Sequence, residues 1–96
     1  MYQVEKWSQA TIQKVWQGAS YVSAENEVNG FRKDACGAWI QFGQHGNRDS
    51  KYGWEIDHIK PVALGGSDSM VNLQPLNWQN NVAKGDSSVL KCAVKG

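Results

Sequence analysis

Residues 54–61 of this chain read WEIDHIKP, and the fold around them follows from that stretch. Apolar and polar side chains alternate at every second position, which is the pattern of a β-strand, and Pro61 ends the strand because it has no backbone N–H to donate. Asp57 and His58 are neighbours at its end, so their side chains leave opposite faces. One of them can hold a metal ion while the other activates water.

Composition limits the classes of protein to consider. The 96 residues are enough for one domain, and ten Lys and Arg against nine Asp and Glu give a net charge of +1. This balance excludes a broadly basic surface, so any contact with nucleic acid must be local. The chain shows neither an apolar run of the about 18 residues that a membrane span needs nor a secretion leader. We expect a soluble cytoplasmic protein with no membrane partner.

The two cysteines, Cys36 and Cys92, belong to no Cys-x-x-Cys pair. The sequence therefore offers no zinc knuckle. In a reducing compartment we expect two free thiols packed as small apolar groups, with a disulfide between them as the open alternative.

The first part of the chain predicts one helix and one strand. Ser8 can cap a helix over residues 9–18, where apolar side chains recur at helical spacing until Gly18. Residues 19–35 show no sustained period, and we expect an irregular connection there. Residues 36–42 are apolar and aromatic, which favours a strand.

The second part predicts a strand, a long loop, a strand and a helix. Residues 54–58 form the first strand, and the loop that follows carries Gly65 and Gly66. Residues 73–78 can return as a second strand, which Pro75 confines to an edge or a bulge. Residues 78–84 favour a helix that stops at a glycine. The tail, residues 87–96, shows no decisive pattern.

This order of elements, with Asp57-His58 ending the first strand, Asn72 before the second and Asn81 and Lys84 on the helix, resembles the HNH endonuclease family. The resemblance implies a small α+β domain with a ββα-metal (His-Me finger) core over residues 36–86. An N-terminal helix and its connection fill residues 1–35, and residues 87–96 form a tail to the same compact domain.

The resemblance also implies roles, one residue at a time. Asp57 is expected to be the first metal ligand and Asn81 the second, while His58 is the general base that takes a proton from the attacking water. Asn72 is expected to hold the loop against the strand by backbone hydrogen bonds. Glu55 shares the strand face of Asp57, and it can be an acceptor behind the ligands, a third ligand or an ordinary paired acid.

A carboxylate and an amide oxygen are hard ligands that leave several positions of a divalent ion open for water and phosphate. They favour one Mg²⁺ or Mn²⁺ ion over Zn²⁺, although Ni²⁺ or Zn²⁺ can occupy such a site in a purified sample. Basic side chains near the site can contact phosphate or be ordinary surface charges. These nucleic-acid-binding candidates are Lys84, Arg48, Lys51 and Lys60.

Many proteins of the family hold a structural zinc with two Cys-x-x-Cys pairs. Here the corresponding places read CGAW at residues 36–39 and NWQN at residues 77–80, so only Cys36 remains. We expect packing of large apolar side chains to take the place of the zinc and to hold the predicted helix. The residues expected to do so are Trp39, Trp54, Trp78 and Val82.

Two function classes follow. The first is a metal-dependent endonuclease that hydrolyses DNA phosphodiester bonds, alone or within a larger restriction, packaging or toxin system. The second is a nucleic-acid-binding module on the same scaffold without catalytic activity. The joint presence of Asp57, His58 and Asn81 favours the first, because binding alone needs no such set. The sequence sets neither the preferred DNA site nor the oligomeric state.

Overall fold

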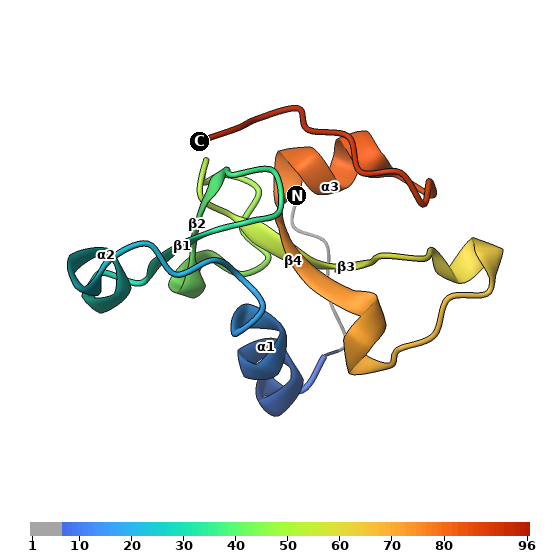
Figure 1. Cartoon of the computed structure of the whole chain (residues 1–96), viewed down its shortest axis with the longest axis horizontal. Helices are drawn as coiled ribbons and strands as arrows, with labels where there is room; N and C mark the ends of the chain where they lie inside the picture. The colour runs from blue at the N-terminus through green and yellow to red at the C-terminus, as the bar shows by residue number, and fades with distance from the viewer. Residues whose placement is uncertain (1–6) are drawn as a thin grey trace.

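The structure is a computed structural model that describes residues 7–96. Three α-helices and two separate two-stranded antiparallel sheets lie within these residues (Figure 1). In chain order they are α1 (Gln9–Trp16), α2 (Ala24–Val28), β1 (Phe31–Lys33), β2 (Trp39–Gln41), β3 (Trp54–His58), β4 (Leu73–Asn77) and α3 (Trp78–Lys84). The α+β architecture predicted from the sequence is confirmed.

The centre of the fold is the ββα unit formed by β3, β4 and α3. Strand β3 pairs with β4 in a register that sets Asp57 opposite Gln74 and Ile56 opposite Pro75. The proline is tolerated because β4 is an edge strand of a two-stranded sheet. Helix α3 begins directly after β4, and the side chain of Asn77 caps it. The predicted strand, loop, strand and helix are all present.

Helix α1 covers one face of the β3–β4 sheet, and α3 covers the other (Figure 1). Ser8 caps α1 by accepting a hydrogen bond from the Thr11 N–H, as predicted, and the helix ends at Trp16 rather than at Gly18. The rings of Trp16 and Trp54 lie 5.2 Å apart between helix and sheet. The apolar cluster there comprises Ile12, Val15, Trp16, Ala19, Ile40, Trp54, Ile56 and Leu73.

Residues 19–35 are not the irregular connection that we expected, because they form α2 and β1. Ser23 caps α2 by accepting a hydrogen bond from the Asn26 N–H. Arg32 of β1 reaches back to the helix and donates to both carboxylate oxygens of Glu27, at 2.9 and 2.7 Å. These hydrogen bonds lower the pKa of Glu27 and raise the pKa of Arg32. Such short elements have no hydrophobic period to recognise, since caps and tertiary pairing hold them.

A buried carboxylate joins β1 and β2 to the ββα unit. Asp34 is 3% exposed, and its Oδ1 accepts hydrogen bonds from the backbone N–H groups of Cys36 and Ala38, both at 2.9 Å. Its Oδ2 accepts from the backbone N–H of Asn77 at 2.9 Å and from Nδ2 of Asn80 at 3.0 Å. We call Asp34, Asn77 and Asn80 the Asp34 hub. Its turn also shortens the strand expected over residues 36–42, which begins only at Trp39.

The Asp34 hub connects residues 36–39 with residues 77–80, the two places where the resemblance puts a zinc knuckle. Oxygen and nitrogen atoms of the chain itself make the connection there. The expected replacement by tryptophan packing is wrong, because Trp39 and Trp78 are only half-buried, and of the three only Trp54 is fully buried. The zinc's structural role falls to a hydrogen-bond network instead.

Helix α3 is also anchored by polar groups rather than by the apolar face that we expected. Val82 is 54% exposed, and the buried residues of the helix are Asn80 and Lys84. The reason lies in the strand beneath the helix, because alternation turns the carboxylates of Glu55 and Asp57 to this face of the sheet. A helix that covers two buried acids must offer donors to them.

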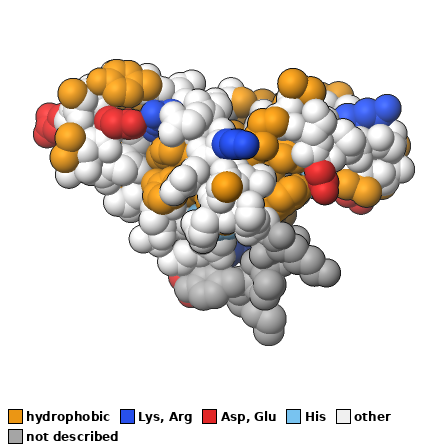
Figure 2. Space-filling view, turned by 90° about the horizontal axis from the view of Figure 1, so that it is seen from below, with side chains coloured by type: hydrophobic (Ala, Val, Ile, Leu, Met, Phe, Trp, Pro, Cys, Tyr) orange, Lys and Arg blue, Asp and Glu red, His pale blue; other side chains and the backbone are white. Residues whose placement is uncertain are grey.

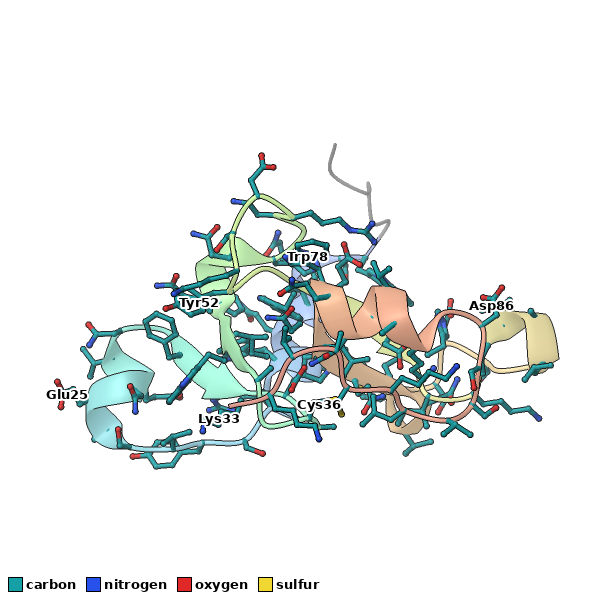
Figure 3. The ribbon with its side chains drawn as sticks, turned by 90° about the horizontal axis from the view of Figure 1, so that it is seen from above. Glu25, Lys33, Cys36, Tyr52, Trp78 and Asp86 are labelled. Carbon is teal, nitrogen blue, oxygen red and sulfur yellow. A yellow bond between two sulfur atoms is a disulfide. The ribbon has the colours of Figure 1, made fainter. Side chains whose placement is uncertain are left out.

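Cys36 and Cys92 form a disulfide, so the expected free thiols are wrong and the alternative holds. After α3 the tail runs from Asp86 back across the molecule past Cys36 (Figure 3). There Asn80 binds it twice, through hydrogen bonds with the backbone N–H and carbonyl of Val94 at 2.8 and 3.0 Å. The tail is therefore a covalently attached part of the fold. We expected free thiols because we expected a cytoplasmic location, which is reducing. Disulfides are instead typical of oxidising compartments.

Figure 2 shows one face of the molecule, on which Lys and Arg side chains lie singly and not in one basic patch. Among residues 7–96, no helix has the length and apolar character needed to cross a bilayer.

Candidate active site

Asp57 lies on the α3 side of β3 and is 5% exposed. Its Oδ1 lies 3.2 Å from Nζ of Lys84, and its Oδ2 accepts a hydrogen bond from Nε2 of Gln74 at 2.9 Å. Lys84 is itself 3% exposed and also donates to the backbone carbonyl of His58 at 2.8 Å. The ammonium group therefore neutralises Asp57 and fixes the end of β3. We expected Lys84 to contact phosphate at the surface, but its side chain is buried against Asp57.

His58 lies on the opposite face of β3, where its Nε2 is 2.7 Å from Oδ1 of Asp68. A carboxylate only accepts hydrogen bonds, so in the neutral ring Nε2 carries the proton and Nδ1 is the basic nitrogen. The ring of Trp7 lies beside it, with 5.7 Å between the ring centroids. Sequence reasoning missed both neighbours, because Asp68 is one of several polar loop residues and Trp7 precedes α1.

Asn72 braces the loop between β3 and β4. Its Oδ1 accepts from the Lys60 N–H at 2.8 Å, and its Nδ2 donates to the carbonyls of Lys60 and Ser67 at 3.0 and 2.8 Å. Gly66 lies so close to Lys60 that a side chain there would overlap the Lys60 carbonyl. These are the backbone hydrogen bonds expected of Asn72, and they fix the loop on which Asp68 sits.

Glu55 is fully buried between two donors. Arg48 donates to it through Nε at 2.7 Å and Nη2 at 2.8 Å, and Asn81 donates through Nδ2 at 2.8 Å. Because the amide nitrogen of Asn81 faces a carboxylate, its Oδ1 is turned away from Glu55 and is available as an acceptor. Among the roles left open for Glu55, the contacts fit an acceptor behind Asn81 that is also ion-paired with Arg48.

Three of the predicted site residues meet in one open pocket of about 280 Å³. They are Asp57, His58 and Asn81, and Asp86 at the end of α3 is a fourth polar group that the sequence did not indicate. The loop between β3 and β4 forms another wall. The residues that define the pocket are Asp57, His58, Pro61, Val62, Asn81 and Asp86.

The four predicted phosphate contacts divide into two pairs. Lys84 is buried against Asp57, and Arg48, whose side chain is 30% exposed, is paired with the buried Glu55. Lys60 and Lys51 are exposed, and Lys51 lies on the wall of a different pocket. The sequence shows which residues are charged, but it does not show which basic side chain pairs with which acidic one.

The donor set can be tested against the divalent ion that the fold implies. Within residues 7–96, no group of three or more His, Cys, Asp or Glu side chains is arranged to hold a metal. Asp57 and the oriented Oδ1 of Asn81 are hard oxygen donors on one pocket wall, which fits an Mg²⁺-like ion that keeps most of its water. They are less typical of Zn²⁺, whose protein ligands are mostly His and Cys, with Asp or Glu in some sites. An ion at Asp57 has to share that carboxylate with Lys84.

Comparison with protein families matches residues 43–87 to the HNH endonuclease family. This part of the chain, a little under half of it, is similar to the HNH endonuclease family. The HNH match covers β3, β4, α3 and every polar residue of the pocket, and it leaves out α1, α2, β1, β2 and Asp34. It links the chain to nuclease or nucleic-acid-related function. No curated protein and no solved structure matches the chain.

Proposed function

We propose that this protein is a metal-dependent endonuclease that hydrolyses DNA phosphodiester bonds. The observation that carries the proposal is the pocket of the HNH segment, which Asp57, His58 and Asn81 line together, with the amide oxygen of Asn81 turned away from Glu55 and the His58 imidazole paired with Asp68. A phosphodiester has no easily polarised carbonyl, so its hydrolysis needs a base for the water and charge stabilisation at the phosphate.

His58 supplies the base. Asp68 holds the Nε2–H of the ring, which leaves Nδ1 to take a proton from the attacking water and stabilises the imidazolium that results. The water oxygen then bonds to phosphorus, the bond to the leaving oxygen breaks, and that oxygen leaves with a proton from solvent. Asn72 supports this geometry from a distance, because it fixes the loop that carries Asp68.

Asp57 and Asn81 are the residues that would hold the divalent ion, which supplies positive charge to the scissile phosphate when bound. Mg²⁺ or Mn²⁺ suits these oxygen donors best. Glu55 and Arg48 keep the amide oxygen of Asn81 turned outward, and Gln74 fixes one oxygen of Asp57. The protein thereby positions its few ligands through polar partners on neighbouring elements.

One observation favours the second candidate, a binding module without catalysis. The Lys84 ammonium already neutralises Asp57, and a positive charge at that distance opposes a second cation. Titration calorimetry with Mg²⁺ and Mn²⁺ separates the two candidates. The nuclease requires binding of a divalent ion that weakens in both Asp57→Ala and Asn81→Ala. Absence of any metal binding, together with retained binding of DNA, supports the module.

Plasmid nicking in Mg²⁺, Mn²⁺ or Ni²⁺, with EDTA as the blank, tests the activity itself. We expect His58→Ala to slow nicking about 10²- to 10⁴-fold, the usual contribution of a general base, while metal binding persists. His45→Ala is the matched control, because this half-exposed histidine lies outside the pocket. Nicking by His58→Ala at the rate of the control contradicts the proposed role.

A further inference from the structure

Among residues 7–96, the pocket at Asp57 is lined by no lysine or arginine. The ionisable side chains that line it there are Asp57, His58 and Asp86. Lys84 and Arg48 are paired with buried acids, and the exposed Lys60 belongs to the loop that forms one wall but is not among the lining residues. A bound ion can balance one phosphate there, but the affinity for a polyanion must come from another surface.

The outer face of the β1–β2 sheet is such a surface. In its register Phe31 lies opposite Gln41 and Lys33 opposite Trp39. Opposed residues of an antiparallel pair point to the same side, so all four share one half-exposed face. The alternate residues of both strands are buried on the inner face. This leaves a small sheet with an aromatic and cationic outer side.

Three aromatic rings on this side pack edge to face. Phe31 lies 6.1 Å from Trp39 and 5.0 Å from Tyr52, measured between ring centroids. Nζ of Lys33 lies 4.7 Å from the centre of the Trp39 ring, and Nζ of Lys51 lies 5.1 Å from that of Tyr52. Figure 3 shows Lys33 and Tyr52 at this end of the molecule, away from Asp86. Aromatic rings with lysines above them are the chemistry that binds bases and phosphates together.

Between this sheet, the start of α3 and the returning tail lies a second pocket, of about 330 Å³. The residues that matter in it are Trp39, Lys51, Tyr52, Asn77, Gln79 and Lys95. No Asp or Glu side chain is among the described residues that line it. It therefore differs from the Asp57 pocket both in the charge of its lining side chains and in its aromatic wall. We call it the aromatic–lysine pocket.

The two pockets meet opposite ends of α3. Asn77, which precedes the helix, lines the aromatic–lysine pocket, and Gly85, which follows it, lines the Asp57 pocket. The seven residues of α3 span about 10 Å at 1.5 Å per residue. This length corresponds to about three nucleotides at the 3.4 Å rise of a strand in duplex DNA, and to fewer in a more extended single strand. One DNA strand is thus long enough to reach both pockets.

We propose that the aromatic–lysine pocket binds a single-stranded stretch of DNA next to the cleaved bond. Unpaired bases stack on Trp39 and Tyr52, and Lys51 and Lys95 contact the phosphates. A single strand is the fitting occupant because only an unpaired base can present its ring face to an aromatic side chain. This inference rests on the proposed function, since it assigns the flanking part of the same substrate.

Anisotropy of a short labelled oligothymidylate in EDTA measures this contact without metal-dependent cleavage. We expect Trp39→Leu to weaken binding about 5- to 150-fold, the usual loss of one stacked base. Lys51→Gln combined with Lys95→Gln should reduce the slope of log affinity against log salt by about 1.4, at about 0.7 per phosphate contact. The matched control is Lys14→Gln combined with Lys91→Gln, because these two exposed lysines do not line the pocket.

If Trp39→Leu fails to fold, the variant with Lys51→Gln and Lys95→Gln tests the proposal alone. Both lysines are exposed, so their replacement should leave the fold intact. An affinity and salt slope equal to those of the control overturn the proposal, and so does an equal loss for blunt duplex DNA. The proposed function fails separately. If the oligonucleotide binds through these residues while plasmid is never nicked, the pocket stands without the nuclease. If nicking is normal and the variants bind as the control does, the pocket alone is wrong.

Discussion

Two buried aspartates flank helix α3, and their surroundings are opposite in kind. Asp34, at the start of the helix, accepts four N–H hydrogen bonds, three of them from the backbone, and a disulfide and the tail lie around it. Asp57, near the end of the helix, is held within residues 7–96 by the side chains of Gln74 and Lys84 and lines an open pocket. The first carboxylate is bound mainly by backbone donors, whereas side-chain donors alone bind the second among the described residues.

The hydrogen-bond donors of the two aspartates distinguish an acid with a structural role from one that can bind a ligand. Burial alone does not separate them, because the two residues are 3% and 5% exposed. The partners do, since backbone donors cannot turn away from a carboxylate while a lysine or glutamine side chain can. A buried acid that is paired with side-chain donors beside a pocket is the better candidate for taking a ligand, because a side chain can adopt another rotamer.

The largest expected effect is the loss of nicking in Asp57→Asn. The change keeps the size of the side chain and removes the charged ligand, so nicking in Mg²⁺ should fall to the EDTA background. The substitution also leaves the Lys84 ammonium buried without its partner, which lowers stability. We expect Lys84→Met in the same chain to restore the unfolding temperature without restoring nicking. Activity of either variant at the parent rate contradicts the assignment of Asp57.

Asp34→Asn should show the reverse pattern. One acceptor oxygen becomes an NH₂ group, so two of the four buried N–H donors lose their partner. At about 1–3 kcal/mol for each, the free energy of unfolding should fall by about 2–6 kcal/mol. Urea unfolding gives this number, and nicking per folded molecule should stay at the parent rate. If Asp34→Asn is as stable as the parent but has lower activity per folded molecule, the assignment of Asp34 as structural and Asp57 as functional is contradicted.

The disulfide sharpens the structural side of the comparison. Replacing Cys36 and Cys92 together by serine should lower the free energy of unfolding by about 2–4 kcal/mol, because the tail is no longer tied to the Asp34 turn. The parent protein treated with a reductant should behave like the double variant, which is the internal control. A variant as stable as the oxidised parent shows that Asn80 alone is enough to hold the tail.

The smallest effect concerns an acid at the surface. Arg32 holds the pKa of Glu27 below its ordinary value of 4.5, mainly through a side-chain hydrogen bond. Because the folded pKa is depressed, this stabilisation is fully present above pH 4.5 and is lost as the pH falls through the lower folded value. The difference in unfolding temperature between the parent and Glu27→Gln should be constant at neutral pH and shrink in acid. A difference that is independent of pH means that the pair adds nothing through this charge.

Local patterns were sufficient for the ββα unit and for α1. Alternation over residues 54–58, the caps at Ser8 and Asn77 and the helical spacing in α1 all act within a few residues of the chain. The strand alternation also settled that Asp57 and His58 leave opposite faces of β3. These features survive in the structure because local preference and tertiary packing agree there.

Tertiary contacts decided the rest. Asp34 meets the N–H of Asn77 across 43 positions of the chain, and Lys84 meets Asp57 across 27, so no short window of sequence contains either pair. The sequence by itself determined the HNH-like order of elements and the residue types at its pocket. Only the folded chain determined which charges neutralise one another, which acid stays open to a ligand, and that Cys36 finds Cys92. Those choices depend on which buried groups come close enough to satisfy one another, and a sequence pattern carries no such distance.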